Sequence, residues 1–224
     1  MTLIENVSEV MSRVVLEDKN KLSNSNRSTT IVGVTKYVDA NQAKALVEAG
    51  ITNIGENRVE LFLDKYHQLH EMPITWHLIG TLQRRKVKDV INYVDYFHAL
   101  DSVKLAKEIN NRADHAINCF LQVNISGETS KHGFSIAELT QVLPELAKLE
   151  NIVVVGIMTM TPREATEDEK NSIFAEAKAL QENILSQEIL NMPCTELSMG
   201  MSQDYPQAIK HGATFVRIGS EFFK

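Results

Sequence analysis

The stretch TIVGVTK, residues 30–36, sets the pattern that decides the fold. Its β-branched residues predict a short buried strand, yet it ends in Lys36, whose charge is unusual at a buried strand tip. A helical pattern follows from Asp39, which forms a capping box with Gln42, and it ends at Gly50. A strand followed by a helix is therefore the unit to look for along the chain.

The same unit recurs through the rest of the sequence. Short runs rich in β-branched residues alternate with stretches of helical period, and capping boxes at Ser135 and Thr166 begin two of the helices. Eight such strands predict an α/β fold, a single (β/α)8 TIM-type barrel domain over 1–224 with an extra N-terminal helix. A doubly wound open sheet is the alternative if one of the two weakest strands is false. The expected strands are 30–35, 52–55, 74–80, 94–100, 117–125, 152–158, 194–199 and 213–219, of which 52–55 and 194–199 are the weakest.

Composition and charge exclude several classes of protein. Hydrophobic residues make up 43% of the 224 residues, and a net charge of −6 argues against binding nucleic acid over the whole surface. No apolar run reaches the roughly 18 residues of a membrane span, and no basic and apolar leader precedes the first helix. Cys119 and Cys194 lie far apart in apolar surroundings, which predicts two free buried thiols in a cytoplasmic protein.

The loops after the last two strands have the chemistry of an anion site. In a barrel of this kind the chemistry lies at the carboxyl ends of the strands, and the loops after strands seven and eight commonly hold a phosphate. Here those loops read GMS at 200–202 and IGS at 218–220. Gly200 and Gly219 let backbone N–H groups approach an anion, and the two serines add hydroxyl donors.

Lys36 stands opposite this predicted phosphate site. Val32, Val34 and Lys36 share one face of the first strand, so the lysine points into the barrel mouth if the valines fill the interior. One interpretation is an ordinary lysine whose stem packs while its charge reaches water. The other is a Schiff-base lysine, because a desolvated amine is more readily neutral and nucleophilic. An amine facing a phosphate cradle suggests a phosphorylated aldehyde, and pyridoxal phosphate fits both ends.

Motifs over almost the whole chain resemble the pyridoxal phosphate homeostasis proteins, single-domain barrels related to the N-terminal domain of alanine racemase. The most specific are WHLIGTLQ at 76–83 and LSMGMSQDY at 197–205, and they are joined by VGVTK, GENRVEL, GIMTM and VRIGS. By this resemblance the chain binds pyridoxal 5′-phosphate as an internal aldimine on one lysine. The residues implied are Lys36 for the aldimine, Asn57 and Arg217 against the ring, with Arg217 near the pyridine nitrogen or the phosphate, and Met201, Ser202, Gly219 and Ser220 around the phosphate.

The resemblance implies a carrier, buffer or regulator of the cofactor, with cofactor-dependent apo-enzymes as candidate partners. The alternative is an amino-acid racemase or another enzyme that uses pyridoxal phosphate. Racemases of this fold take a second base from a separate β-domain and a partner chain, whereas this sequence ends at Lys224, soon after the eighth strand. A site with one lysine lacks the opposing base for proton transfer on two faces. We therefore expect cofactor binding without robust turnover, in a monomer.

Three further signals are weaker. His67 and His70 share one helical face, but no third ligand is near, so we expect two surface histidines rather than a metal site. Lys131, in a polar loop after the fifth strand, is a second lysine that could receive the cofactor during transfer. His77 and His98 either line the barrel mouth or make structural hydrogen bonds within it.

Overall fold

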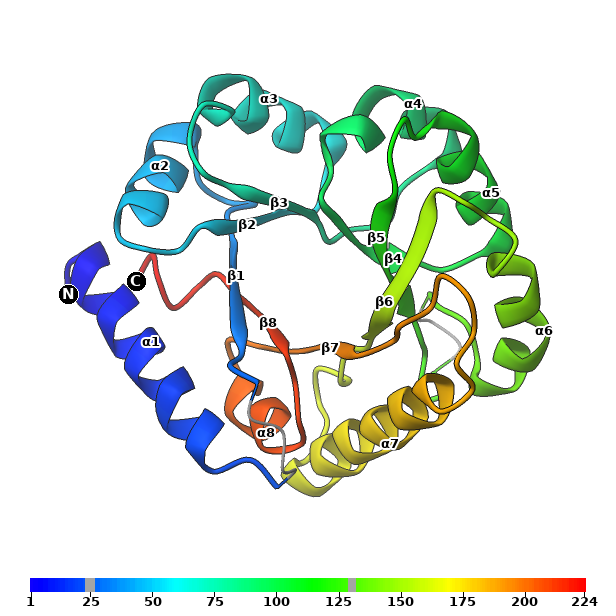
Figure 1. Ribbon diagram of the computed structural model, residues 1–224. Coiled ribbons are helices and arrows are strands. Elements are labelled where there is room, and N and C mark those ends of the chain that lie inside the picture. Colours follow the sequence, from blue (N-terminus) through cyan, green and yellow to red (C-terminus); the bar gives the residue numbers. More distant parts are fainter. Residues whose placement is uncertain (23–26, 129–131) are drawn as a thin grey trace.

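The strands form a closed parallel barrel in the order of the sequence (Figure 1). The structure is a computed structural model that describes residues 1–22, 27–128 and 132–224. The prediction of a TIM-type barrel is confirmed, and the open sheet is wrong because the last strand pairs with the first, with Val32 opposite Arg217. The strands are β1 Thr30–Val34, β2 Asn53–Glu56, β3 Thr75–Leu78, β4 Tyr96–Leu100, β5 Ile117–Gln122, β6 Ile152–Met158, β7 Glu196–Met201 and β8 Phe215–Ile218.

Helices surround the barrel, and their buried faces cover the outer side of the strands (Figure 1). The capping boxes expected at Asp39, Ser135 and Thr166 are present and begin α2, α6 and α7. The helices that follow β1 to β7 are α2 Ala40–Glu48, α3 Val59–Leu69, η1 Arg84–Lys86, α4 Val87–Val90, η2 Ile91–Tyr93, α5 Val103–Arg112, α6 Ile136–Leu146, α7 Glu167–Leu185 and α8 Tyr205–Lys210.

The N-terminal helix α1, Leu3–Lys19, completes the ring of helices. It packs between α8 and α2, which is the place that a helix following β8 would take (Figure 1). Its buried side chains include Asn6, whose Nδ2 donates to the carbonyl oxygen of Phe222 at 3.0 Å. The extra helix of the sequence prediction is therefore an integral wall of the barrel.

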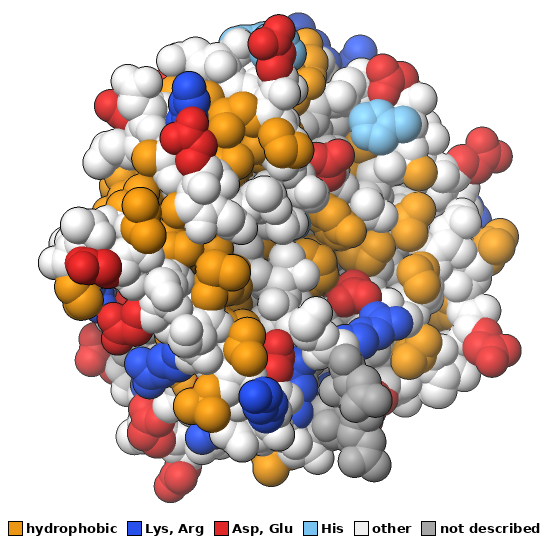
Figure 2. All heavy atoms as spheres, turned by 60° about the vertical axis from the view of Figure 1, so that its left-hand side comes forward, with side chains coloured by type: hydrophobic (Ala, Val, Ile, Leu, Met, Phe, Trp, Pro, Cys, Tyr) orange, Lys and Arg blue, Asp and Glu red, His pale blue; other side chains and the backbone are white. Residues whose placement is uncertain are grey.

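The outer face of α1 carries apolar side chains. Ile4, Met11, Val15 and Leu16 are 41–71% exposed there. Figure 2 turns this side of the molecule toward the viewer and shows apolar side chains lying between acidic and basic ones. Across the three described ranges, no helix combines the length and the apolar character needed to cross a membrane.

Candidate functional site

Lys36 lies just beyond β1, at the carboxyl end of the barrel, and is half-buried. Its Nζ lies 4.9 Å from the centre of the Tyr37 ring, and Tyr37 itself is 90% exposed. Among the described residues, the Lys36 ammonium has no hydrogen-bond or ion-pair partner. An amine without such a partner at the mouth is free to react with a ligand.

The loops that follow β7 and β8 touch one another. The Gly219 N–H donates to Ser202 Oγ at 3.4 Å. Gly200 has a φ of +90°, and a Cβ there would lie 2.5 Å from Ala208 Cβ. A Cβ on Gly219 would lie 2.8 Å from the Val34 carbonyl oxygen, two residues before the lysine of the first strand. Close packing therefore requires glycine at both positions. The absence of a side chain also lets a ligand approach their backbone N–H groups.

Met201, the last residue of β7, and Ser220, just beyond β8, lie at the outer edge of this region. Met201 is 38% exposed and Ser220 is exposed. The Met201 N–H already donates to Asp204 Oδ1 at 2.7 Å, and the buried Asp204 also accepts from Thr161 Oγ1 at 2.6 Å. The backbone N–H of Met201 is therefore already bonded within the protein. The glycines and serines at the ends of β7 and β8 lie near the mouth.

Asn57 and Arg217 bring polar atoms to the same end of the barrel. β1 and β2 pair with Val34 opposite Gly55, so Lys36 and Asn57 each lie two residues beyond a paired position. Asn57 Oδ1 is buried, and within the described residues no group hydrogen-bonds to it. A buried amide oxygen without a partner costs free energy, so this atom fits a site that a polar ligand completes.

Arg217 is buried, with 5% of its surface exposed, and is held by one residue of β7 and one residue just beyond β6. Its Nη1 donates to Ser198 Oγ at 2.6 Å and its Nη2 to the Thr159 carbonyl oxygen at 3.1 Å. Burial lowers its pKa to about 10, against the opposing effect of Asp204, so the guanidinium remains a cation at neutral pH. An arginine has five N–H donors, which leaves donors for a ligand.

The two strand histidines lie inside the barrel rather than at its mouth, since both are fully buried. His77 Nδ1 lies 2.9 Å from His98 Nε2, and His98 Nδ1 lies 2.8 Å from Ser198 Oγ. Burial lowers the pKa of His77 to about 3 and that of His98 well below its ordinary value. The interpretation as structural hydrogen bonds is confirmed, and both rings are neutral at physiological pH.

A buried ion pair behind β1 and β2 escaped the sequence analysis. Lys65 Nζ lies 2.7 Å from Glu56 Oε1, which also accepts from Thr35 Oγ1 at 2.6 Å. Both charged side chains are at most 2% exposed. The signal was present, because Lys65 shares the buried stripe of α3 with Phe62 and Leu69.

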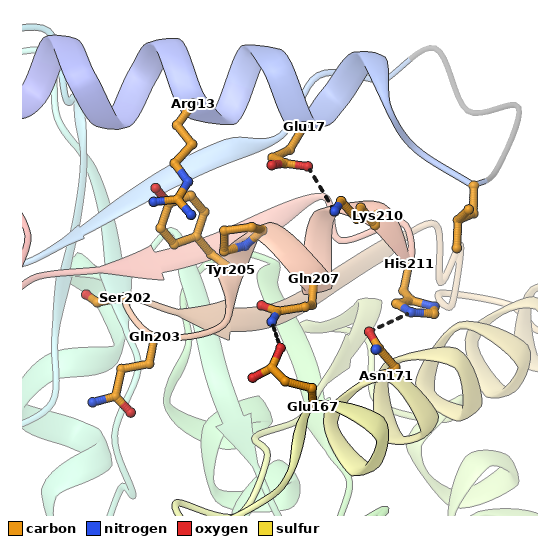
Figure 3. A pocket seen from close by; sticks show the side chains of 12 residues that line it. Arg13, Glu17, Glu167, Asn171, Ser202, Gln203, Tyr205, Gln207, Lys210 and His211 are labelled. Atoms are coloured by element: carbon orange, nitrogen blue, oxygen red, sulfur yellow. Dashed lines mark hydrogen bonds and ion pairs between the residues drawn. The ribbon is translucent and has the colours of Figure 1, made fainter.

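A cavity of about 710 Å³ lies outside the barrel between α1, α7 and α8 (Figure 3). Polar side chains that line it are paired with each other: Lys210 Nζ lies 3.8 Å from Glu17 Oε2, and His211 Nε2 lies 3.2 Å from Asn171 Oδ1. Of the residues that the resemblance implies, only Ser202 lines it. This cavity therefore adjoins the loop after β7 at Ser202, and Lys36 does not line it.

The remaining residues noted in the sequence are two histidines, two cysteines and one lysine. In the part of the chain that is described, no three His, Cys, Asp or Glu side chains are grouped to hold a metal, and His67 and His70 are both exposed. Cys119 and Cys194 are free and buried as expected, and burial raises the pKa of Cys194 to about 12. Lys131 lies outside the described residues.

Comparisons with known proteins place this chain among single-barrel relatives. Pyridoxal phosphate homeostasis proteins of Aquifex aeolicus and Synechocystis sp. are 32% and 35% identical to it, over 100% and 88% of this chain and 98% and 91% of their own lengths. The structure of PipY from Synechococcus elongatus, 30% identical with full coverage of both chains, matches with a TM-score of 0.89 without PLP and 0.87 with PLP bound.

The more distant likeness is to alanine racemase. An alanine racemase of Clostridium difficile matches with a TM-score of 0.74 at 17% identity, over 98% of this chain and 59% of that one, which shows a shared fold. The family model for the N-terminal domain of alanine racemase matches residues 21–224. With this match and the full-length relatives above, the chain belongs to the pyridoxal phosphate homeostasis proteins of the alanine racemase N-terminal domain family.

Proposed function

We propose that this protein binds pyridoxal 5′-phosphate and helps to keep its intracellular supply in balance, as a carrier, buffer or regulator. The observation that carries the proposal is Lys36, an amine without a hydrogen-bond or ion-pair partner among the described residues. It stands beside two contacting glycine loops. Relatives with this name and a PipY structure with PLP bound support the choice of cofactor.

In this proposal the cofactor is held at two ends. Lys36 Nζ adds to the aldehyde carbon and releases water, which leaves an internal aldimine. Ser202, Gly219 and Ser220 donate to the phosphate through hydroxyl and backbone groups, and Met201 borders it with its exposed side chain. The ring or the phosphate then meets the two remaining polar groups, the unpartnered amide of Asn57 and the guanidinium of Arg217.

The proposed role is to hold the cofactor without robust turnover. The names of the full-length relatives favour homeostasis over catalysis, whereas alanine racemases share only the fold at this level of identity. Cofactor-dependent apo-enzymes as recipients, a monomeric state and a cytoplasmic location are part of the same proposal.

The cofactor test adds pyridoxal phosphate to the purified protein and follows the visible absorption of a protein-bound imine. Borohydride should fix the adduct, and peptide mass analysis should place it on Lys36. Lys36→Ala should lose the band, whereas Lys44→Ala, on the exposed side of α2, should retain it. No band and no binding in the wild-type protein, or an adduct on another lysine, would contradict the proposal.

The second test addresses turnover. Loaded protein is incubated with single enantiomers of amino acids, and the opposite enantiomer is measured over time. We expect no sustained conversion. Conversion that continues over many turnovers and disappears in Lys36→Ala would establish an enzyme instead.

A further inference from the structure

A file of hydrogen-bonded side chains crosses the barrel from Arg217 to Asn53. It runs from Arg217 to Ser198, on to His98, then to His77, and ends at Asn53, with heavy-atom distances of 2.6, 2.8, 2.9 and 3.0 Å. β4 pairs with β3 and β5, and β7 pairs with β6 and β8, so the bond between His98 and Ser198 spans the interior. Its two ends lie on the strands that flank β1, where Asn53 and Arg217 are both paired with Val32.

The arginine end of the file fixes the direction of its first bonds. A guanidinium only donates, so Ser198 Oγ must accept from Arg217. The serine hydroxyl has one proton, which is then free to be donated to His98 Nδ1. A neutral His98 that accepts at Nδ1 carries its proton at Nε2, and it donates that proton toward His77.

The asparagine end requires the same direction. With Asn53 Oδ1 accepting, His77 Nε2 carries the proton, and His77 Nδ1 must accept from His98 Nε2. Neighbouring rings hold the two imidazoles in these orientations, because His77 stacks on Tyr96 at 4.9 Å and His98 stacks on Phe120 at 4.4 Å. The three inner members, Ser198, His98 and His77, can therefore each use one donor and one acceptor in a single consistent order, from Arg217 as donor and with Asn53 as the last acceptor.

At the arginine end of the file, Ser198 contacts the guanidinium directly. Arg217 is held by Ser198 Oγ and by the Thr159 carbonyl oxygen, and the Thr159 N–H in turn donates to the Ser198 carbonyl oxygen at 3.2 Å. Ser198 therefore supports both contacts of the arginine. A neutral Nδ1 of His98 takes the hydroxyl proton and so keeps a lone pair of Ser198 Oγ turned toward Arg217.

We propose that Asn53, His77, His98 and Ser198 form a one-directional hydrogen-bond file that positions Arg217 for the cofactor. These four are positioning residues, since their effect passes through the arginine. The inference rests on the proposed function for its ligand, but its geometry belongs to the ligand-free protein. It names residues deep in the barrel, remote from the lysine and the phosphate loops, as determinants of cofactor affinity.

The first experiment needs no cofactor. Nitrogen-15 NMR of the histidine side chains in the wild-type protein reports which ring nitrogen carries the proton. Both His77 and His98 should carry it at Nε2, with Nδ1 unprotonated, at neutral pH. A proton at Nδ1 of either ring, or a doubly protonated ring, overturns the proposed direction.

The second experiment uses a matched pair of variants at Ser198. Ser198→Thr keeps the hydroxyl. Ser198→Val introduces a side chain of nearly the same shape as threonine but without the hydroxyl. In the ligand-free protein, the guanidinium signals of Arg217 should persist in Ser198→Thr and broaden or shift in Ser198→Val. Ser198→Ala, which adds no bulk, should behave like Ser198→Val and serves if the larger side chains do not fit.

The third measurement connects the file to the cofactor. Ser198→Val should bind pyridoxal phosphate roughly tenfold more weakly than Ser198→Thr, the loss expected for one hydrogen bond to a charged group. The visible band of the bound cofactor should shift in Ser198→Val and not in Ser198→Thr. Equal affinities and equal spectra in the two variants overturn the positioning role. Absence of binding in the wild-type protein would instead refute the proposed function. The ligand-free NMR measurements would still show whether the hydrogen bonds of the file run in the proposed direction and whether Ser198 holds Arg217.

Discussion

Two groups of buried polar side chains lie on either side of the barrel wall, and burial is tolerated differently in each. Outside the wall, toward α3, Glu56 and Lys65 are both at most 2% exposed and form an ion pair at 2.7 Å. Inside it, His77 and His98 are equally buried but neutral, and each is bonded at both ring nitrogens. Glu56 and Lys65 are buried as charges that face each other, while the two histidines are buried as neutral rings with alternating donors and acceptors.

The comparison also bears on the two lysines of this region. Lys65 is held by a carboxylate, so its amine is not available to a ligand. Lys36 stands a short way off at the mouth without such a partner. This difference between the two lysines agrees with the proposal that Lys36, and not Lys65, meets the aldehyde of the cofactor.

The largest expected effect comes from breaking the ion pair. Lys65→Met leaves the Glu56 carboxylate buried without its cation and should lower the free energy of unfolding by about 3–5 kcal/mol. Urea denaturation measures this change. The double variant Glu56→Gln/Lys65→Met should recover much of it, because no lone charge remains.

The matched control is the same substitution at an exposed pair. Lys107, 3.0 Å from Glu145, is 55% exposed, and Lys107→Met should change stability far less than Lys65→Met. Similar losses in the two variants would mean that burial does not make the inner pair more important.

A smaller effect is expected from the hydroxyl that joins the pair to β1. Thr35→Val keeps the shape of a fully buried side chain but removes its hydrogen bond to Glu56. The free energy of unfolding should fall by about 1.5–3 kcal/mol, the range for a bond to a charged group. Thr35→Ser retains the hydroxyl and should lose less. A larger loss in Thr35→Ser than in Thr35→Val would show that packing, and not the hydrogen bond, matters at this position.

The smallest expected change in the free energy of unfolding, counted per pH unit, comes from the two neutral histidines of the file. The unfolded chain protonates its histidines near pH 6.5, whereas burial holds the pKa of folded His77 at about 3. Between these values the unfolded state binds more protons, so the free energy of unfolding falls as pH falls, by about 1.4 kcal/mol per unit for each such histidine. Above pH 7 this contribution to pH dependence disappears.

Denaturation from pH 7 to 4 tests the sign and the size of this effect. His77→Phe should be less stable at pH 7, yet its stability should fall less steeply with acid than that of the wild-type protein. His77→Phe/His98→Phe should reduce the slope about twice as much. Unchanged slopes in both variants would show that the two rings gain protons as readily folded as unfolded.

Much of the fold could be read from the sequence because its signals are local. The β-branched runs gave all the strands to within a few residues, and the alternation at Val32, Val34 and Lys36 placed the lysine at the mouth. The loops at 200–202 and 218–220, which the sequence predicts at one end of the barrel, contact each other through the bond between Gly219 and Ser202. Strand order supplied that contact, since neighbouring strands of a closed barrel bring their loops together.

The contacts that cross the barrel could not be predicted in the same way. His98 and Ser198 are 100 residues apart and lie on strands that do not pair, so only the closed barrel brings them together. The bond from Met201 to Asp204 likewise depends on the exact turn after β7. Lys65 was the exception, because a lysine in an apolar helical stripe is a local signal that was overlooked.

The placement of α1 in the ring has a consequence for how the chain is made. α1 packs on α8, and its Asn6 is bonded to Phe222, 216 residues later in the chain. On the ribosome, the first helix therefore emerges long before α8 and Phe222, which form much of the surface on which it packs. Closure of the barrel and docking of this helix become one late event, of the kind that makes non-local folds slow to form and dependent on protection of their nascent chains.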